Sequence, residues 1–175
     1  MAAFILIIGL QGTGKSTLAR QLAEQLKAIS ISTEAVRHAL FEPTRLPGQD
    51  QDFTDHEIAV SYRAVNYFVS LISDLPLNVV VDGVFRYEAQ RQSLISLAAG
   101  RQIVKVHLHC EESVVKQRLL RRQAGETYAP GGINAHQKAK TQFERPTNDY
   151  LHFDTTTLRS HHILEALLSK HLLTS

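Results

Sequence analysis

Short apolar runs alternate along this chain with segments in which apolar residues recur every three or four positions. Residues 3–8 are continuously apolar, and leucines recur every fourth position within residues 15–27, as on one face of a helix. Residues 77–81, which end in three consecutive valines, are typical of a parallel strand buried on both faces. Further strands are predicted at 29–32, 102–109 and 150–153, and further helices at 34–41, 54–72, 87–99, 112–123, 134–143 and 158–173.

This strand–helix order predicts an α/β fold with a five-stranded parallel sheet. Helices are expected on both faces of the sheet, in three layers, because right-handed crossovers place them there. No repeat or linker divides the 175 residues, so one domain over 1–175 is predicted. Residues 124–132 are rich in glycine, and we expect a short lid at about 122–135.

A glycine-rich segment joins the first expected strand to the first expected helix. Residues 9–16 read Gly-Leu-Gln-Gly-Thr-Gly-Lys-Ser, which is the phosphate-binding P-loop pattern in its strand–loop–helix context. Backbone N–H groups and the helix N-terminus would face a phosphate there. Lys15 is expected to reach the β- and γ-phosphates, and Ser16 to ligate Mg²⁺. The residues predicted to bind the nucleotide are Gly9, Gln11, Gly12, Thr13, Gly14, Lys15, Ser16 and Thr17.

Ligands of open parallel sheets bind beyond the carboxyl ends of the strands, so residues just after each strand are candidates. Glu34 and Arg37 follow the second strand and lie on one helical face. Glu34 is a candidate base, and Arg37 a candidate clamp for substrate or phosphoryl group. The alternative is that Glu34 only favours the helix dipole.

The third expected strand ends in Asp82, which is followed by a glycine. An acid at the end of an apolar strand is costly to bury without a partner, and a cation would supply one. Asp82 is therefore predicted to bind Mg²⁺ or to act as the base. A turn-forming aspartate is the alternative.

Two arginines precede the glycine-rich segment on one helical face. Arg118 and Arg122 are spaced by four residues, and an arginine near the γ-phosphate would offset charge developing in phosphoryl transfer. The alternative is a basic helix C-terminus that complements the dipole.

Composition narrows the class of partner. The net charge is only +2, so nucleic acid is an unlikely partner. A lone cysteine, Cys110, excludes an internal disulfide and suits a cytoplasmic location. No apolar stretch is long enough to span a membrane. The oligomeric state has no recognisable signature.

Five segments together resemble the P-loop kinases of the AAA_33 type, relatives of gluconate kinase, polynucleotide 5′-kinase, chloramphenicol phosphotransferase and the zeta toxins. They are residues 9–17, Ser32-Thr-Glu34-Ala-Val-Arg37, Val80-Val-Asp82-Gly-Val-Phe85, Arg118-Leu-Leu-Arg-Arg122 and Phe153-Asp-Thr-Thr156. The resemblance implies that Glu34 stands where the family has an aspartate base, with Asp82 as the alternative base, and that Asn134 stands where the lid often carries an acid. It also implies that residues 154–156 lie near the adenine.

These features predict an ATP- and Mg²⁺-dependent enzyme that phosphorylates a hydroxyl group of a small molecule. Lys15, Mg²⁺ and Arg118 or Arg122 would stabilise the transferring phosphoryl group. The alternatives are a nucleotide-dependent switch or ATPase without an acceptor, and a kinase of polynucleotide 5′-hydroxyl ends. The acceptor itself has no recognisable sequence pattern.

Overall fold

A five-stranded parallel sheet forms the centre of the computed structural model, which describes residues 2–41, 53–125, 133–147 and 149–172. The strands are β1 (Ala3–Ile8), β2 (Ile29–Ser32), β3 (Val79–Gly83), β4 (Gln102–His109) and β5 (Leu151–Asp154). Their order in the sheet is β2-β3-β1-β4-β5, and every neighbouring pair is parallel. The predicted α/β fold is confirmed.

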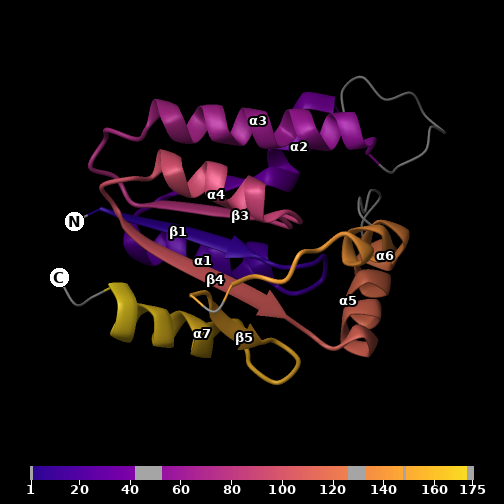
Figure 1. The fold of residues 1–175 in the computed structure, drawn as a ribbon. Helices are drawn as coiled ribbons and strands as arrows, with labels where there is room; N and C mark the ends of the chain where they lie inside the picture. Colours follow the sequence, from indigo (N-terminus) through magenta and orange to yellow (C-terminus); the bar gives the residue numbers. More distant parts are fainter. Residues whose placement is uncertain (1, 42–52, 126–132, 148, 173–175) are drawn as a thin grey trace.

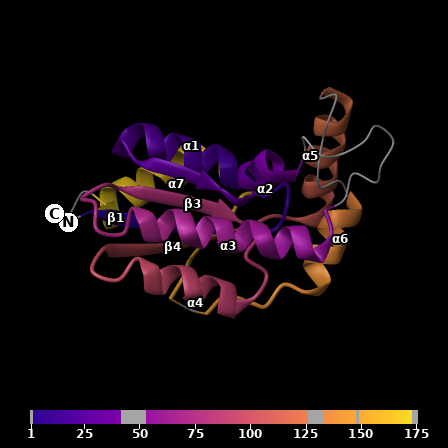
Figure 2. The same cartoon turned by 90° about the horizontal axis from the view of Figure 1, so that it is seen from above.

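Helices cover both faces of the sheet (Figure 1). They are α1 (Lys15–Leu26), α2 (Thr33–Phe41), α3 (Asp55–Leu71), α4 (Glu88–Leu97), α5 (Glu112–Gly125), α6 (Ile133–Thr141) and α7 (Ser160–Leu167), followed by a π-helix over Leu168–Leu172. Helices α3 and α4 lie on one face, and α1 and α7 on the other. Viewed from above, α5 and α6 project beyond one end of the sheet (Figure 2).

Two apolar cores result from the alternation of side chains along β1. Ile5 and Ile7 pack toward α1 and α7, whereas Phe4, Leu6 and Ile8 pack toward α3 and α4. All five side chains are fully buried, as expected for a central parallel strand. The sheet is therefore a rigid support that fixes where each strand ends.

The ends of some strands and helices differ from the prediction. The third strand runs through Asp82 to Gly83, because it stays paired with β1 as far as Ile8. The last helix begins at Ser160 rather than at 158. Of the Tyr and Phe residues of α3, Tyr62 is buried, whereas Tyr67 and Phe68 are 62% and 44% exposed.

The predicted lid falls largely on residues 126–132, which lie outside the described residues. On its two sides, α5 extends to Gly125 and α6 begins at Ile133. Across the described parts of the chain, no helix has the length and apolar character needed to cross a membrane.

Candidate functional site

The loop after β1 has a backbone that requires glycine. Gly9, Gly12 and Gly14 have φ angles of +147°, +80° and +91°. A Cβ atom at Gly9 would stand 2.3 Å from the carbonyl oxygen of Leu108. Gly14 is the N-cap of α1, where no side chain caps the helix and no acid occupies the first turn. The first N–H groups of α1 thus remain available to an anion.

Ser16 and Asp82 form a pair of oxygen groups beside this loop. The Ser16 hydroxyl donates a hydrogen bond of 3.1 Å to Oδ2 of Asp82, whose residue is only 3% exposed. Burial raises the pKa of the Asp82 carboxyl, and the nearby charge of Lys15 opposes this shift. A buried carboxylate next to a hydroxyl suits a divalent cation, because the cation would offset the cost of the buried charge.

The donor set fits Mg²⁺ that is held jointly with phosphates. Within the described ranges, no three histidine, cysteine, aspartate or glutamate side chains gather in a way that could hold a metal ion by themselves. Mg²⁺ commonly takes only one or two protein ligands and completes its shell with water and substrate phosphates. Ser16 and Asp82 are the protein groups suited to that role.

Two cavities meet at the P-loop. The first has a volume of about 120 Å³ and lies among the P-loop, the start of α2, the end of β3 and α6. The second has a volume of about 620 Å³ and lies among the P-loop, α5 and the segment after β5. Gln11 and Lys15 line the first cavity, whereas Gly12, Thr13 and Gly14 line the second. The loop therefore presents separate surfaces to the two cavities.

Four of the predicted catalytic residues line the first cavity together: Lys15, Glu34, Arg37 and Asp82. Glu34 is exposed in the first turn of α2, where it faces the cavity. Arg37 lies one turn further, with its guanidinium carbon 5.4 Å from the centre of the Phe53 ring. Desolvation lowers the pKa of Arg37, and the nearby Glu34 opposes this shift. Carboxylates and cations thus face one small cavity.

Arg118 lines the second cavity instead. It donates from Nη1 to the carbonyl oxygen of Gly12 at 3.1 Å, and from Nη2 to the carbonyl oxygen of Thr155 at 2.7 Å. The residue ties the P-loop to the segment that follows β5. Arg122 belongs to α5, but its side chain lies outside the described residues.

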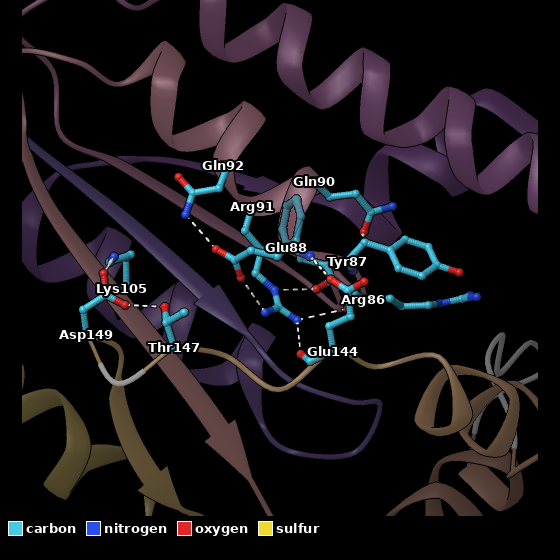
Figure 3. A network of polar contacts seen from close by, with 11 residues as sticks. Arg86, Tyr87, Glu88, Gln90, Arg91, Gln92, Lys105, Glu144, Thr147 and Asp149 are labelled. Carbon is cyan, nitrogen blue, oxygen red and sulfur yellow. Dashed lines mark hydrogen bonds and ion pairs between the residues drawn. The ribbon is translucent and has the colours of Figure 1, made fainter.

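Sequence reasoning missed Arg86 and Arg91. Arg86 is 9% exposed and lines the first cavity, whereas Arg91 is completely buried in α4. Arg91 holds the backbone on both sides of Arg86, through a network that includes Glu88 and Glu144 (Figure 3). The only sequence signal was that Arg86 follows closely after Asp82 at the end of a strand.

A second polar cluster joins α5 to α6. Glu112 accepts hydrogen bonds from Lys140 at 2.9 Å and from Gln137 at 2.7 Å, and the buried His136 lies 3.2 Å away. The Lys140 hydrogen bond is the main reason that the pKa of Glu112 falls to about 2. The cluster fixes α6, which carries Ala135 and Lys138 to the wall of the first cavity.

Several known proteins are similar to this chain in sequence. A model of the AAA_33 family, described as an AAA domain, matches residues 4–146. An adenylyl-sulfate kinase of Enterobacter sp. (strain 638) is 28% identical over 156 residues, which cover 83% of this chain and 71% of that protein.

Solved structures share the fold. A sugar kinase of Janibacter sp. HTCC2649 has a TM-score of 0.74 at 17% identity, over 97% of this chain and 94% of that one. An APS kinase of Mycobacterium tuberculosis, solved in complex with AMPPNP and APS, has a TM-score of 0.71 at 19% identity, over 99% and 98%. A gluconokinase of Sinorhizobium meliloti 1021 has a TM-score of 0.69 at 20% identity, over 95% and 90%.

Proposed function

Because the chain belongs to the AAA_33 family and is a P-loop phosphotransferase, we propose that it transfers the γ-phosphate of ATP to a hydroxyl group of a small molecule. The observation that carries the proposal is the pair of cavities meeting at the P-loop, since the reaction needs a donor and an acceptor on either side of the transferred group. The reaction belongs in the cytoplasm, where ATP is supplied.

The second cavity suits the nucleotide. It is the larger of the two, and it is lined by Gly12 and Gly14, whose N–H groups would face a phosphate. Arg118 and the segment after β5 form its far wall and would enclose the base and sugar. Lys15 lines the first cavity, and its ammonium group would stabilise charge on the γ-phosphate.

Ser16 and Asp82 would hold Mg²⁺, which when bound neutralises charge on the β- and γ-phosphates. The hydrogen bond between them leaves Glu34 as the exposed carboxylate of the first cavity. We therefore assign the base role to Glu34, which would accept the proton of the acceptor hydroxyl, and the metal role to Asp82. Arg37, from the same helix face, would orient the acceptor.

The test is ATP consumption with and without hydroxyl compounds, in the presence and absence of Mg²⁺. The panel includes gluconate and adenylyl sulfate, which are suggested by the relatives, together with sugars, nucleosides and a 5′-hydroxyl oligonucleotide. We expect ATP turnover to rise at least tenfold with a small-molecule acceptor and to require Mg²⁺. Turnover that no compound raises would favour a switch or ATPase, and a response to the oligonucleotide alone would favour a polynucleotide kinase.

Two variants separate binding from chemistry. Lys15→Ala should abolish nucleotide binding, because it removes the cation that contacts the phosphates. Glu34→Gln should retain ATP binding but lower turnover by about 10²–10⁴-fold, the range for loss of a general base. Glu24→Gln, an exposed site on α1, serves as the matched control. An unchanged turnover rate in Glu34→Gln would mean that Glu34 is not the base and only interacts with the helix dipole.

A further inference from the structure

We propose that the acceptor carries an anionic group, a carboxylate, sulfate or phosphate, and that Arg37 and Arg86 bind this group in the first cavity. The inference rests on the proposed function in one respect, namely that the bound molecule is the phosphoryl acceptor. The anion site itself follows from the geometry of the cavity. The family model itself names no acceptor, and the chain's net charge of +2 does not point to this site.

Both guanidinium groups have buried nitrogen atoms without partners. The Nε atoms of Arg37 and Arg86 are inaccessible to solvent and have no hydrogen-bond partner among the described residues. Arg86 donates one hydrogen bond from Nη1 to the Gln142 side chain at 2.5 Å, and Arg37 lies against the face of Phe53. Within the described parts of the chain, neither arginine forms an ion pair with a carboxylate. A buried cation without an anion is costly, so a ligand that supplies one would be bound strongly.

Arg91 is a buried arginine with only a structural role, and it serves as a comparison for Arg37 and Arg86. Its Nε donates to the carbonyl oxygen of Phe85 at 2.9 Å, and its Nη1 contacts a Glu88 carboxylate oxygen at 2.9 Å. Its Nη2 donates to the carbonyl oxygens of Arg86 at 3.1 Å and Glu144 at 2.6 Å. Every nitrogen of Arg91 is therefore used within the chain. Arg37 and Arg86 differ from Arg91 in two ways: their Nε atoms are unused, and both residues line a cavity.

The other charges of the first cavity already have roles. Lys138 donates to an Asp55 carboxylate oxygen at 3.0 Å, and Asp82 accepts from Ser16. Lys15 is assigned to the phosphates, and Glu34, which also lines this cavity, is assigned as the base. Arg37 and Arg86 are close enough that, after burial, the charge of Arg86 contributes to lowering the pKa of Arg37. One anion contacting both guanidinium groups would remove this repulsion, and arginine suits carboxylate, sulfate and phosphate because it donates two parallel hydrogen bonds.

The backbone before Arg86 is held in a costly conformation. Phe85 has a φ of +44°, which a bulky residue adopts rarely. The Phe85 N–H donates to the Tyr62 hydroxyl at 3.0 Å, and the Phe85 carbonyl accepts from Arg91. The Arg86 carbonyl accepts from the Glu144 N–H at 2.9 Å. These contacts fix the turn that places Arg86 at the cavity (Figure 3), and they make Arg91 its positioning residue.

The anion site can be tested with inorganic sulfate, without knowing the acceptor. Calorimetric titration is carried out on the protein loaded with AMPPNP and Mg²⁺, so that the P-loop is already occupied. The titration is repeated with chloride at equal ionic strength to remove general salt effects. We expect saturable sulfate binding in the natural chain, weakened at least tenfold in Arg37→Gln and in Arg86→Gln. It should be unchanged in Arg63→Gln, an exposed arginine of α3.

The chemical source of the anion is distinguished by paired compounds. Gluconate is compared with glucose, and adenylyl sulfate with adenosine, as competitors of sulfate binding and as acceptors. The anionic member of one pair should compete and its neutral partner should not. For a compound that is phosphorylated, Arg86→Gln should raise KM at least tenfold with a smaller change in kcat.

Absence of saturable sulfate binding, or equal binding in all three arginine variants, overturns the anion site, provided that thermal melts show the variants to be folded. Phosphorylation of a neutral compound with an unchanged KM in Arg86→Gln also overturns it. Failure of the proposed function is separate, because it would appear as missing AMPPNP binding or missing turnover. Sulfate binding that depends on the two arginines would still support the anion site in that case.

Discussion

The hydroxyl group of Ser16 and the carboxylate of Asp82 are joined by a hydrogen bond of 3.1 Å, although the two residues lie 66 positions apart in the chain. Ser16 stands at the start of α1 and Asp82 near the end of β3, which pairs directly with β1. The parallel register of these two strands brings the groups together. The catalytic arrangement therefore depends on the centre of the sheet.

Asp82→Asn should lower turnover by about 10²–10³-fold, the range for loss of a single charge-stabilising group, while AMPPNP binding persists. It should also raise the Tm of the nucleotide-free protein, because the variant no longer buries a charge. Differential scanning calorimetry and a turnover assay measure both effects, with the exposed Asp74→Asn as the control. A variant with normal turnover would remove Asp82 from the site.

The effect of Asp82→Asn on the Tm should depend on pH. Burial raises the pKa of Asp82 in the folded protein above 3.8, so the native chain loses stability as pH rises through this interval. The Tm advantage of Asp82→Asn should thus be larger at pH 7 than at pH 3.8. An advantage that is equal at both pH values would mean that it does not come from the charge.

Gly83→Ala should destabilise the fold strongly. A Cβ atom at Gly83 would stand 2.5 Å from the Thr33 hydroxyl oxygen and 2.8 Å from the Phe85 ring, and all three residues are buried. Overpacking of this kind costs about 1–3 kcal/mol. Gly100→Ala is the control, since its φ of +88° is strained but no atom lies within 4 Å of the added carbon. Urea unfolding should show the larger loss for Gly83→Ala.

Arg118→Gln should act on nucleotide binding more than on the chemical step. The arginine contacts the Gly12 and Thr155 carbonyl oxygens on the wall of the second cavity, so its loss should raise KM for ATP by about tenfold, the effect of about 1.4 kcal/mol. Lys116→Gln, an exposed position on the same helix, is the control. Steady-state kinetics that show only a loss of kcat would place Arg118 at the γ-phosphate instead.

Glu112→Gln should loosen the junction of α5 and α6 in a pH-dependent manner. Because the pKa of Glu112 falls from 4.5 to about 2 on folding, its contribution to stability is present above 4.5 and is lost as pH falls toward 2. The Tm gap between the natural chain and the variant should close over the same interval. Glu111→Gln, the exposed neighbour, should show no such change.

The sequence predicted much of this architecture because its signals were local. The P-loop pattern and the apolar runs of the strands each depend on residues close together in the chain. The same is true of the capping box that Thr54 and Glu57 form at the start of α3. Gathering Lys15, Glu34 and Asp82 at one cavity was also predictable, since parallel strands end at the same edge of the sheet.

The roles of Arg86 and Arg91 could not be predicted in this way. Arg91 sits on a helix with ordinary spacing, and its complete burial depends on carbonyl groups presented by Phe85 and Glu144, which are distant from each other in sequence. The positive φ of Phe85 could not be read from the sequence either, because such backbone angles are usually signalled by glycine and this residue is a phenylalanine. The placement of Arg118 beside Thr155 depends on the packing of α5 against the segment after β5.

The division of the P-loop between two cavities has a kinetic consequence. Gln11 and Lys15 line one cavity, while Gly12, Thr13 and Gly14 line the other. The loop therefore presents a different surface to each cavity. Among the described residues, neither of the two proposed substrates would have to pass through the other's cavity, so we expect a random order of addition. Initial-rate plots should intersect, with both substrates present together before either product leaves.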